Sequence, residues 1–284
     1  GAYSAAVIPD YKIMGVVNVT PDSFFDGGAH DTPGPAAAHA SKLIAEGADI
    51  VDIGGESTRP GAPEAGPALG NARIAQTVAQ IDARNAAIAV SIDTMKSEVA
   101  AAAIEAGATY VNDVSAFTAD PGLAGLVAST GVECCLMHMQ GDPRTMQDDP
   151  RYVNVVDDVR AHLEERMNFA IAEGVPESKI QLDPGIGFGK TLEHNLELLA
   201  RLDELVSLGR PVVIGVSRKS FISRVAQEAG VGGVDVSERL PGTIAANALA
   251  LERGASVFRV HDVREAAQGL AVAAATLART RQRA

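Results

Sequence analysis

Several residue types and segments are scarce or missing in this sequence, and each absence excludes a class of protein. The 284 residues include no tryptophan and only two cysteines, Cys134 and Cys135, which are adjacent. Neighbours on a strand point to opposite faces, so we expect buried strand thiols rather than a disulfide framework or a metal site. No apolar run approaches the ~20 residues that a membrane-spanning helix requires. The opening GAYSAAVIPDYK also lacks the cationic start and long apolar stretch of a secretory signal, which predicts a cytoplasmic protein.

Positive charge is scarce as well. The chain carries 24 lysine and arginine residues against 36 aspartate and glutamate residues, a formal net charge of −12. Nucleic acids and anionic membranes both favour a basic surface, so the composition argues against either partner. The run GFGK at Gly187–Lys190 lacks the spacing of a phosphate-binding loop, and no early G-x-G-x-x-G is present.

A repeated unit of helix, glycine and strand organises the chain. In each copy an Ala/Leu-rich helical pattern stops at a glycine, and a short apolar run follows that ends in polar residues. The glycine suits the left-handed position that ends many helices. The clear copies are Ile44–Gly55, Ile104–Val114 and Leu251–Asp262, and the looser copies are Ser129–Met139 and Ile171–Gly185.

Eight apolar runs are predicted to form strands. They centre on Ile13–Val17, Ile50–Ile53, Ala89–Ile92, Tyr110–Val111, Cys134–Met137, Ile180–Leu182, Val212–Gly215 and Val257–Val260. Helical patterns lie between them, for example Ala68–Ala83, Ser97–Ala106, Val155–Glu173, Asn195–Ser207 and Arg264–Thr280. Continuous apolar strands suit a sheet buried on both faces, and their alternation with helices implies parallel order.

Eight such units predict a closed (β/α)₈ TIM barrel, which typically takes ~250 residues. An open doubly wound sheet is the alternative, but it usually carries about five or six strands and a nucleotide fingerprint. No linker-like stretch divides the chain. We therefore expect an α/β protein with a single barrel domain over residues 1–284.

Nearly every predicted strand ends in a polar side chain. In a barrel these ends converge on one pocket. An isolated Asp at such a position is often only a cap or a turn residue, but caps do not explain the whole set. The candidates are Asn18, Asp93, Asn112, Asp183, Ser217–Lys219, Arg259 and His261, whereas Asp52, Asp113 and His138 are interpreted as scaffold. The other histidines, His30, His39, His162 and His194, are predicted to lie on the surface.

The candidates divide by chemistry. Asp93, Asn112 and Asp183 offer compact acceptors and an amide, which suit a flat, nitrogen-rich heterocycle with paired donors. Cationic side chains in an acidic protein indicate an anionic substrate, and guanidinium forks favour phosphate or carboxylate. These cations are Arg59, Lys219, Arg259 and His261. The pattern predicts an enzyme that acts on a phosphorylated, ring-bearing metabolite.

Two segments carry a family resemblance. MGVVNVTPDSFFDGG at Met14–Gly28 and DIGGESTRPGA at Asp52–Ala62 look like the signature segments of the dihydropteroate synthases. SIDT, NDV, CLMHMQGDPRTMQ, LDPGIGFGK, GVSRKSF and RVHDV resemble that family in the same order, from about Lys12 to Leu277. The resemblance implies a transferase that joins a dihydropterin diphosphate to 4-aminobenzoate in folate biosynthesis. It also implies Mg²⁺, a homodimer built on outer helices, and inhibition by sulfonamides.

The resemblance also implies roles for individual residues. The pterin ring would be held by Asp93, Asn112, Asp183 and Lys219, with apolar walls from Val114, Met137, Phe188 and Gly215. The diphosphate would contact Thr58, Arg259 and His261, with Mg²⁺ bound by Asn18. The 4-aminobenzoate site would be framed by Phe24, Thr58, Arg59, Pro60, Lys219 and Ser220. The residues expected to take part in catalysis are Asp93, Lys219, Arg259, His261 and Arg59. Thr20–Asp31 and Ser57–Leu69 would be loops that order when the pterin substrate binds, and the GFGK run would shape the loop beside the pterin pocket.

Two rival functions share part of this pattern. A pterin-dependent methyltransferase domain has the same barrel and pterin-holding groups, but it needs no cations for a diphosphate. A non-catalytic paralogue would bind pterin without turnover, and against it every implied catalytic position holds a suitable residue.

Overall fold

The structure is a computed structural model that describes residues 9–19, 34–54, 67–82, 87–141, 145–232 and 235–280. Its strands are β1 Lys12–Asn18, β2 Ile50–Gly54, β3 Ala89–Asp93, β4 Tyr110–Asp113, β5 Glu133–Met137, β6 Ile180–Asp183, β7 Val213–Ile214 and β8 Val257–Val260. All eight predicted strands are thereby confirmed. Most are runs of buried apolar residues, as expected of a parallel sheet covered by helices.

The strands form one nearly closed parallel barrel. Their order is β6-β5-β4-β3-β2-β1-β8-β7, and every pair is parallel. A single bridge between Leu182 and Val212 joins β6 to β7, and the Leu182 N–H donates to the Pro211 carbonyl at 3.0 Å. The predicted (β/α)₈ barrel is confirmed, with β7 as its shortest strand.

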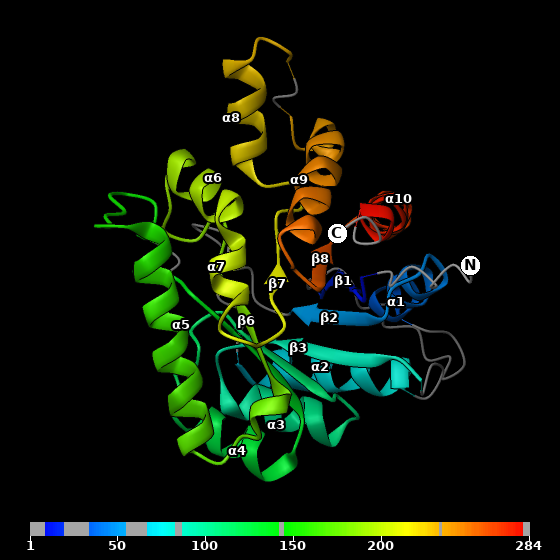
Figure 1. Ribbon diagram of the computed structural model, residues 1–284. Helices are drawn as coiled ribbons and strands as arrows, with labels where there is room; N and C mark the ends of the chain where they lie inside the picture. Colours follow the sequence, from blue (N-terminus) through cyan, green and yellow to red (C-terminus); the bar gives the residue numbers. More distant parts are fainter. Residues whose placement is uncertain are drawn as a thin grey trace, which may run out of the picture.

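Helices surround the strands (Figure 1). They are α1 Pro35–Ala45, α2 Pro67–Asp82, α3 Ser97–Glu105, α4 Gly122–Thr130, α5 Val155–Ala172, α6 Leu192–Ala200, α7 Leu202–Val206, α8 Ser220–Glu228, α9 Leu240–Glu252 and α10 Val263–Thr280, with short 3₁₀ helices η2 Glu177–Lys179 and η3 Val236–Glu238. The glycine of each repeated unit has positive φ, which confirms its predicted helix-ending conformation: Gly47, Gly107, Gly131, Gly174 and Gly254. No helix in the described part of the chain is long and apolar enough to cross a membrane.

One predicted helix was wrong in its extent. Asn195–Ser207 is interrupted at Arg201, which lies between α6 and α7 with φ −113° and ψ 29°. The Arg201 guanidinium donates to Glu197 at 2.8 Å and to Glu204 at 2.7 Å. Pairs at these spacings also occur in continuous helices, and Arg and Glu are good helix formers, so the local sequence does not mark the break.

The apolar core has two parts. The larger cluster fills the space between strands and helices and includes Cys134. The smaller cluster consists of Met14, Ile50, Tyr110, Cys135, Val213 and Val257. The adjacent cysteines therefore join different clusters, as expected for neighbours on a strand. Burial raises the pKa of the Cys134 thiol to about 12.

Candidate active site

The strand periodicity directs the candidate side chains into one site. Side chains two residues apart on a strand share a face of the sheet. A residue two positions after a member of the smaller cluster therefore lies on the same face of the sheet as that cluster. These positions follow Ile50, Tyr110, Cys135, Val213 and Val257, and are occupied by Asp52, Asn112, Met137, Gly215 and Arg259. Five strands thus bring an acid, an amide, a thioether, a glycine and a guanidinium to the carboxyl end of the barrel.

Arg259 on β8 connects two further strands, β2 and β3. Its Nε donates to Asp52 Oδ2 at 2.7 Å, and its Nη2 donates to Asp93 Oδ2 at 3.0 Å. The Asp52 side chain is fully buried, whereas 25% of the Arg259 side chain and 12% of the Asp93 side chain are exposed. Burial opposes the charge of Arg259, but the two carboxylates outweigh it and raise the pKa of Arg259 above its usual value. The guanidinium is therefore a fixed cation at the barrel mouth.

Asp52 accepts hydrogen bonds from three side chains, one of which is this guanidinium. It accepts from Ser91 Oγ at 2.6 Å and from Asn112 Nδ2 at 3.0 Å, besides Arg259. Asp52 is buried, which agrees with its interpretation as scaffold, but its contacts with Asn112 and Arg259 were not foreseen. A sequence signal existed, because Asp52 has the same strand parity as the cluster residue Ile50.

Asp183 and Lys219 form the second charged group of the site. Asp183 ends β6, is buried, and accepts from the Gly185 N–H at 2.7 Å. Burial raises the pKa of Asp183, and the charge of Lys219 opposes that rise. Lys219 Nζ donates to the Ile186 carbonyl and lies 4.7 Å from the centroid of the Phe188 ring. Burial lowers the pKa of Lys219 to about 8.

Gly215 separates the two cations of the site. A Cβ at this position would lie 3.8 Å from Lys219 Nζ and 4.0 Å from Arg259 Cβ. Val114 and Met137, which follow and end β4 and β5, are buried. A side chain in place of Gly215 would thus occupy the space between Lys219 and Arg259.

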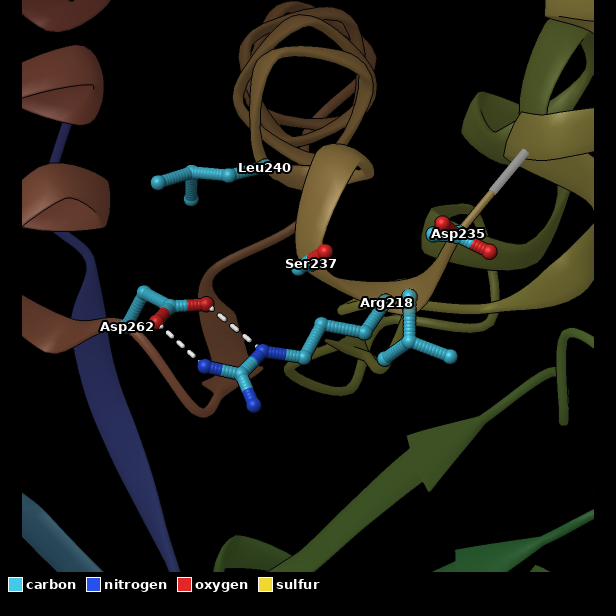
Figure 2. A pocket seen from close by; sticks show the side chains of 6 residues that line it. Arg218, Asp235, Ser237, Leu240 and Asp262 are labelled. Carbon is cyan, nitrogen blue, oxygen red and sulfur yellow. Dashed lines mark hydrogen bonds and ion pairs between the residues drawn. The ribbon is translucent and has the colours of Figure 1, made fainter. Parts of the chain in front are cut away.

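The turn before α8 carries Lys219 and is held by contacts of Arg218 with residues of α9 and the segments next to it. Arg218 has φ +59°, its N–H donates to Thr243 Oγ1 at 3.1 Å, and its carbonyl accepts from Arg239. Its guanidinium makes two hydrogen bonds with Asp262, at 2.9 and 2.5 Å (Figure 2). A cavity of about 570 Å³ lies beside this ion pair, lined by Arg218, Asp235, Val236, Ser237, Leu240 and Asp262. Of the described candidates Arg218 lines that cavity, and none of the described residues to which the resemblance assigns a substrate does so.

The remaining described candidates lie at or just beyond the ends of four elements, β1, β7, β8 and α8. His261 Nδ1 lies 2.9 Å from Ser217 Oγ, which also accepts from the His261 N–H at 3.2 Å. Ser220 is the exposed first residue of α8, and Asn18 is the exposed last residue of β1. Phe24, Thr58, Arg59 and Pro60 lie outside the described residues, as do Thr20–Asp31 and residues 57–66.

The histidines required one correction. His162 and His194 are half-buried rather than surface residues, and they pack against His138 and Tyr152. His39 is exposed as predicted, and His30 lies outside the described residues. The sequence pattern alone did not reveal the burial of His162 and His194, because the rings that they contact come from separate elements.

Lys190 is the site-proximal residue that sequence reasoning missed. It follows the glycine-rich turn after β6, is buried, and contacts His138. The run GFGK was expected to shape a loop, and nothing in its composition distinguishes a buried lysine from an exposed one. No group of three or more His, Cys, Asp or Glu residues in the described ranges could hold a metal ion.

The fold and these contacts define a class of protein, a (β/α)₈-barrel enzyme with paired acids and cations at the carboxyl ends of its strands. A family model described as pterin binding enzyme matches residues 14–261. Dihydropteroate synthase of Escherichia coli strain K12 is 42% identical over 265 residues, which are 93% of this chain and 91% of that protein.

Solved structures agree with these matches. The Yersinia pestis dihydropteroate synthase, in complex with a sulfonamide drug, superposes with a TM-score of 0.85 at 38% identity and 94% coverage of both chains. The Xanthomonas albilineans enzyme in complex with 7,8-dihydropteroate gives 0.79 at 39% identity and 95% coverage of both. The chain belongs to the dihydropteroate synthase family of pterin-binding transferases.

Proposed function

We propose that the chain condenses 6-hydroxymethyl-7,8-dihydropterin diphosphate with 4-aminobenzoate, giving 7,8-dihydropteroate and diphosphate. The observation that carries the proposal is the meeting of Arg259 with Asp52 and Asp93 beside the Asp183 and Lys219 pair at the barrel mouth. Cations for a diphosphate and acids for a nitrogen-rich ring are thus present in one site. A relative that binds 7,8-dihydropteroate supports the choice of product.

The pterin ring is assigned to the Asp183 side of the site. An ionised carboxylate accepts two parallel N–H bonds, which matches the 2-amino group and the adjacent ring N–H. Asn112, held by Asp52, offers its amide oxygen to the same ring edge. Lys219 donates to ring acceptors, and apolar walls come from Val114, Met137, Phe188 and Gly215.

The diphosphate is assigned to Arg259 and His261, with Thr58 as a further donor. Asn18, the exposed last residue of β1, is the proposed Mg²⁺ ligand. Its amide oxygen is the type of ligand that Mg²⁺ binds together with substrate phosphates. Described residues supply no cluster of acids for a cage made by the protein alone, which suits an ion that binds together with its diphosphate. Bound there, Mg²⁺ would neutralise part of the diphosphate charge.

The reaction exchanges one bond for another at the methylene carbon. The C–O bond to diphosphate breaks, and diphosphate leaves with the electron pair while Arg259 and His261 stabilise its growing charge. Asp93 lies near the electron-poor ring that remains. The amine nitrogen of 4-aminobenzoate then forms the C–N bond and loses a proton to solvent. This second substrate is positioned by Phe24, Thr58, Arg59, Pro60, Lys219 and Ser220. Its orientation supplies much of the remaining rate enhancement.

Product formation tests this proposal. Chromatography should detect 7,8-dihydropteroate only when both substrates and Mg²⁺ are mixed with the protein. Product that forms without 4-aminobenzoate, or no product from folded protein, would contradict it.

We expect sulfonamides to inhibit the chain by competing with 4-aminobenzoate. The segments ESTRPG and SRKSF resemble those of sulfonamide-sensitive members, and the Yersinia pestis relative binds such a drug. A sulfonamide should raise the KM for 4-aminobenzoate and leave kcat unchanged. Product formation that is unaffected at high drug concentration would contradict the expectation.

The pKa of Lys219 predicts how activity depends on pH. Because its charge contacts the substrate, kcat/KM for the pterin diphosphate should fall as pH rises through about 8. The free energy of unfolding should change with pH in the opposite direction. Between about 8 and the usual 10.5 the unfolded chain binds this proton and the folded chain does not, so this group makes stability rise with pH. A pH profile of kcat/KM, paired with urea unfolding, checks both signs, and a flat profile from pH 7 to 9.5 would contradict the role of Lys219.

We further propose that the protein works in the cytoplasm as one barrel domain and assembles as a homodimer. Support comes from the resemblance of the sequence to the dihydropteroate synthases. Sedimentation of the purified protein tests the homodimer, and a monomer at all concentrations would contradict it.

A further inference from the structure

A buried lysine next to the site has no part in the reaction described above. Lys190 is only 4% exposed and lies directly after the turn that follows β6. Its Nζ lies 2.9 Å from His138 Nδ1 and donates to the Phe188 carbonyl at 2.9 Å. Burial of an ammonium group is costly unless the group is paired and hydrogen-bonded, so the position of Lys190 in the core requires an explanation.

The ammonium group of Lys190 lies against the turn that holds Asp183. A Cβ on Gly185 would be 3.4 Å from Lys190 Nζ. The Gly185 N–H in turn donates to Asp183 Oδ1 at 2.7 Å. Lys190 Nζ therefore lies beside the residue that orients the carboxylate, and its positive charge helps to oppose the rise in the pKa of Asp183.

The rings around Lys190 fasten the same turn to the rest of the barrel. His138 packs against His162 with centroids 4.9 Å apart, and against Tyr152 with centroids 5.9 Å apart. The Tyr152 hydroxyl donates to the Gly189 carbonyl at 2.6 Å. The turn from Gly185 to Gly189 is therefore attached to β5 through Lys190 and to the segment before α5 through Tyr152.

The protonation states of this group are consistent with a Lys190 that is charged below about pH 7. Burial lowers the pKa of His138 to about 2, with Lys190 and His162 acting in the same direction. His138 is therefore neutral, and its Nδ1 can accept from the Lys190 ammonium group. Burial lowers the pKa of Lys190 to about 7, while Asp183 opposes and Lys219 adds to that shift. The charged and titratable groups that face Lys190 are thus Asp183, Lys219, His138 and His162.

We propose that Lys190 is a positioning residue: it fixes the turn after β6 against β5 and supplies positive charge behind the Asp183 carboxylate that binds the pterin ring. The inference rests on the proposed function, because it takes Asp183 as the pterin-binding acid. Lys190 does not touch substrate. It acts through Gly185 and through its charge.

Two variants separate charge from packing. Lys190→Met removes the ammonium group and keeps the length of the side chain, whereas Lys190→Gln keeps a donor for the Phe188 carbonyl without the charge. Lys42→Met is the matched control, because Lys42 is an exposed lysine on α1 whose side chain is 67% exposed. The probe is 6-hydroxymethylpterin, which lacks the diphosphate, and its Kd is measured calorimetrically between pH 5 and 8.

Both Lys190 variants should weaken pterin binding about tenfold at pH 6.5, since a charge that favours the ionised Asp183 is lost. The acid limb of pterin binding, which is the weakening of binding as the pH falls, should move up by about one pH unit, because Asp183 then protonates more readily. The KM for the pterin diphosphate should rise, whereas the KM for 4-aminobenzoate stays within about twofold, as expected when one subsite is affected. Lys42→Met should match the unsubstituted protein.

The opposite results would overturn the proposal. Folded variants with an unchanged pterin Kd and an unmoved acid limb would remove Lys190 from pterin binding. Lower stability with an unmoved acid limb, or failure of both variants to fold, would assign Lys190 a purely structural role. Unsubstituted protein that binds pterin without releasing pyrophosphate would defeat the proposed reaction, while the binding comparison would still decide the role of Lys190.

Discussion

Replacement of Arg259 by methionine should slow pyrophosphate release by about 10²–10³-fold at saturating substrate, the usual cost of removing one charge-stabilising donor. Arg259 is held by Asp52 and Asp93, so its guanidinium is already oriented before substrate binds. Its fixed charge can therefore stabilise the departing diphosphate without reorganisation. The loss should appear mainly in kcat, because the charge on the leaving group grows in the transition state.

The same substitution should also destabilise the fold. It leaves the fully buried Asp52 carboxylate without its cation. Breaking a buried pair in this way costs roughly 3–5 kcal/mol, and the partial exposure of Arg259 places the expected loss near the lower end. Urea unfolding measures it, and Arg264→Met is the matched control because the Arg264 side chain is 76% exposed.

A double variant distinguishes the two effects. Asp52→Asn combined with Arg259→Met removes the uncompensated charge, so stability should partly recover. Pyrophosphate release should not recover, because the cation for the leaving group is still missing. Recovery of activity in the double variant, or normal activity of Arg259→Met, would contradict the role of Arg259.

Replacement of Gly185 by alanine should abolish measurable pterin binding. Gly185 has φ +69°, and a Cβ there would overlap the His138 carbonyl oxygen, which is backbone and cannot move independently. The turn must therefore shift, and the N–H that orients Asp183 shifts with it. We expect pterin Kd to rise by at least about 10²-fold, since a displaced charge-assisted recognition group loses most of its binding free energy.

Gly209→Ala is the matched control for the backbone conformation. Gly209 has φ +79°, and a Cβ there would have no atom within 4 Å. Alanine at this position should cost only the roughly 1–2 kcal/mol of a left-handed residue and leave pterin binding intact. Equal effects of the two substitutions in calorimetry and thermal unfolding would mean that the contact with His138 is unimportant.

Much of the barrel could be predicted because its signals are local. Each strand is a short apolar run, and glycines such as Gly47 and Gly254 end the preceding helices in a conformation that few other residues adopt. The break at Arg201 could not be predicted, since Arg and Glu favour helices and Arg201 also contacts the distant residues Asn154 and Asp157.

The site was predicted in composition and less well in connectivity. Strand parity places Asn112 and Arg259 in the barrel mouth, but the bond from Arg259 to Asp52 joins residues 207 positions apart. Lys190 was missed for a related reason. Its partner His138 is 52 positions away, and a lysine after glycines is usually exposed. The substrate-binding roles of all the site residues stay predictions, and Phe24, Thr58, Arg59 and Pro60 lie outside the described ranges.

The most direct measurement is pyrophosphate release on mixing the protein with dihydropterin hydroxymethyl diphosphate, 4-aminobenzoate and Mg²⁺, each omitted in turn. We expect release only when all three are present, and a sharp fall when Arg259 or Lys219 is replaced by alanine. Folded protein that binds the pterin but releases no pyrophosphate would contradict the synthase reaction, and would favour a pterin-binding paralogue or a methyltransferase.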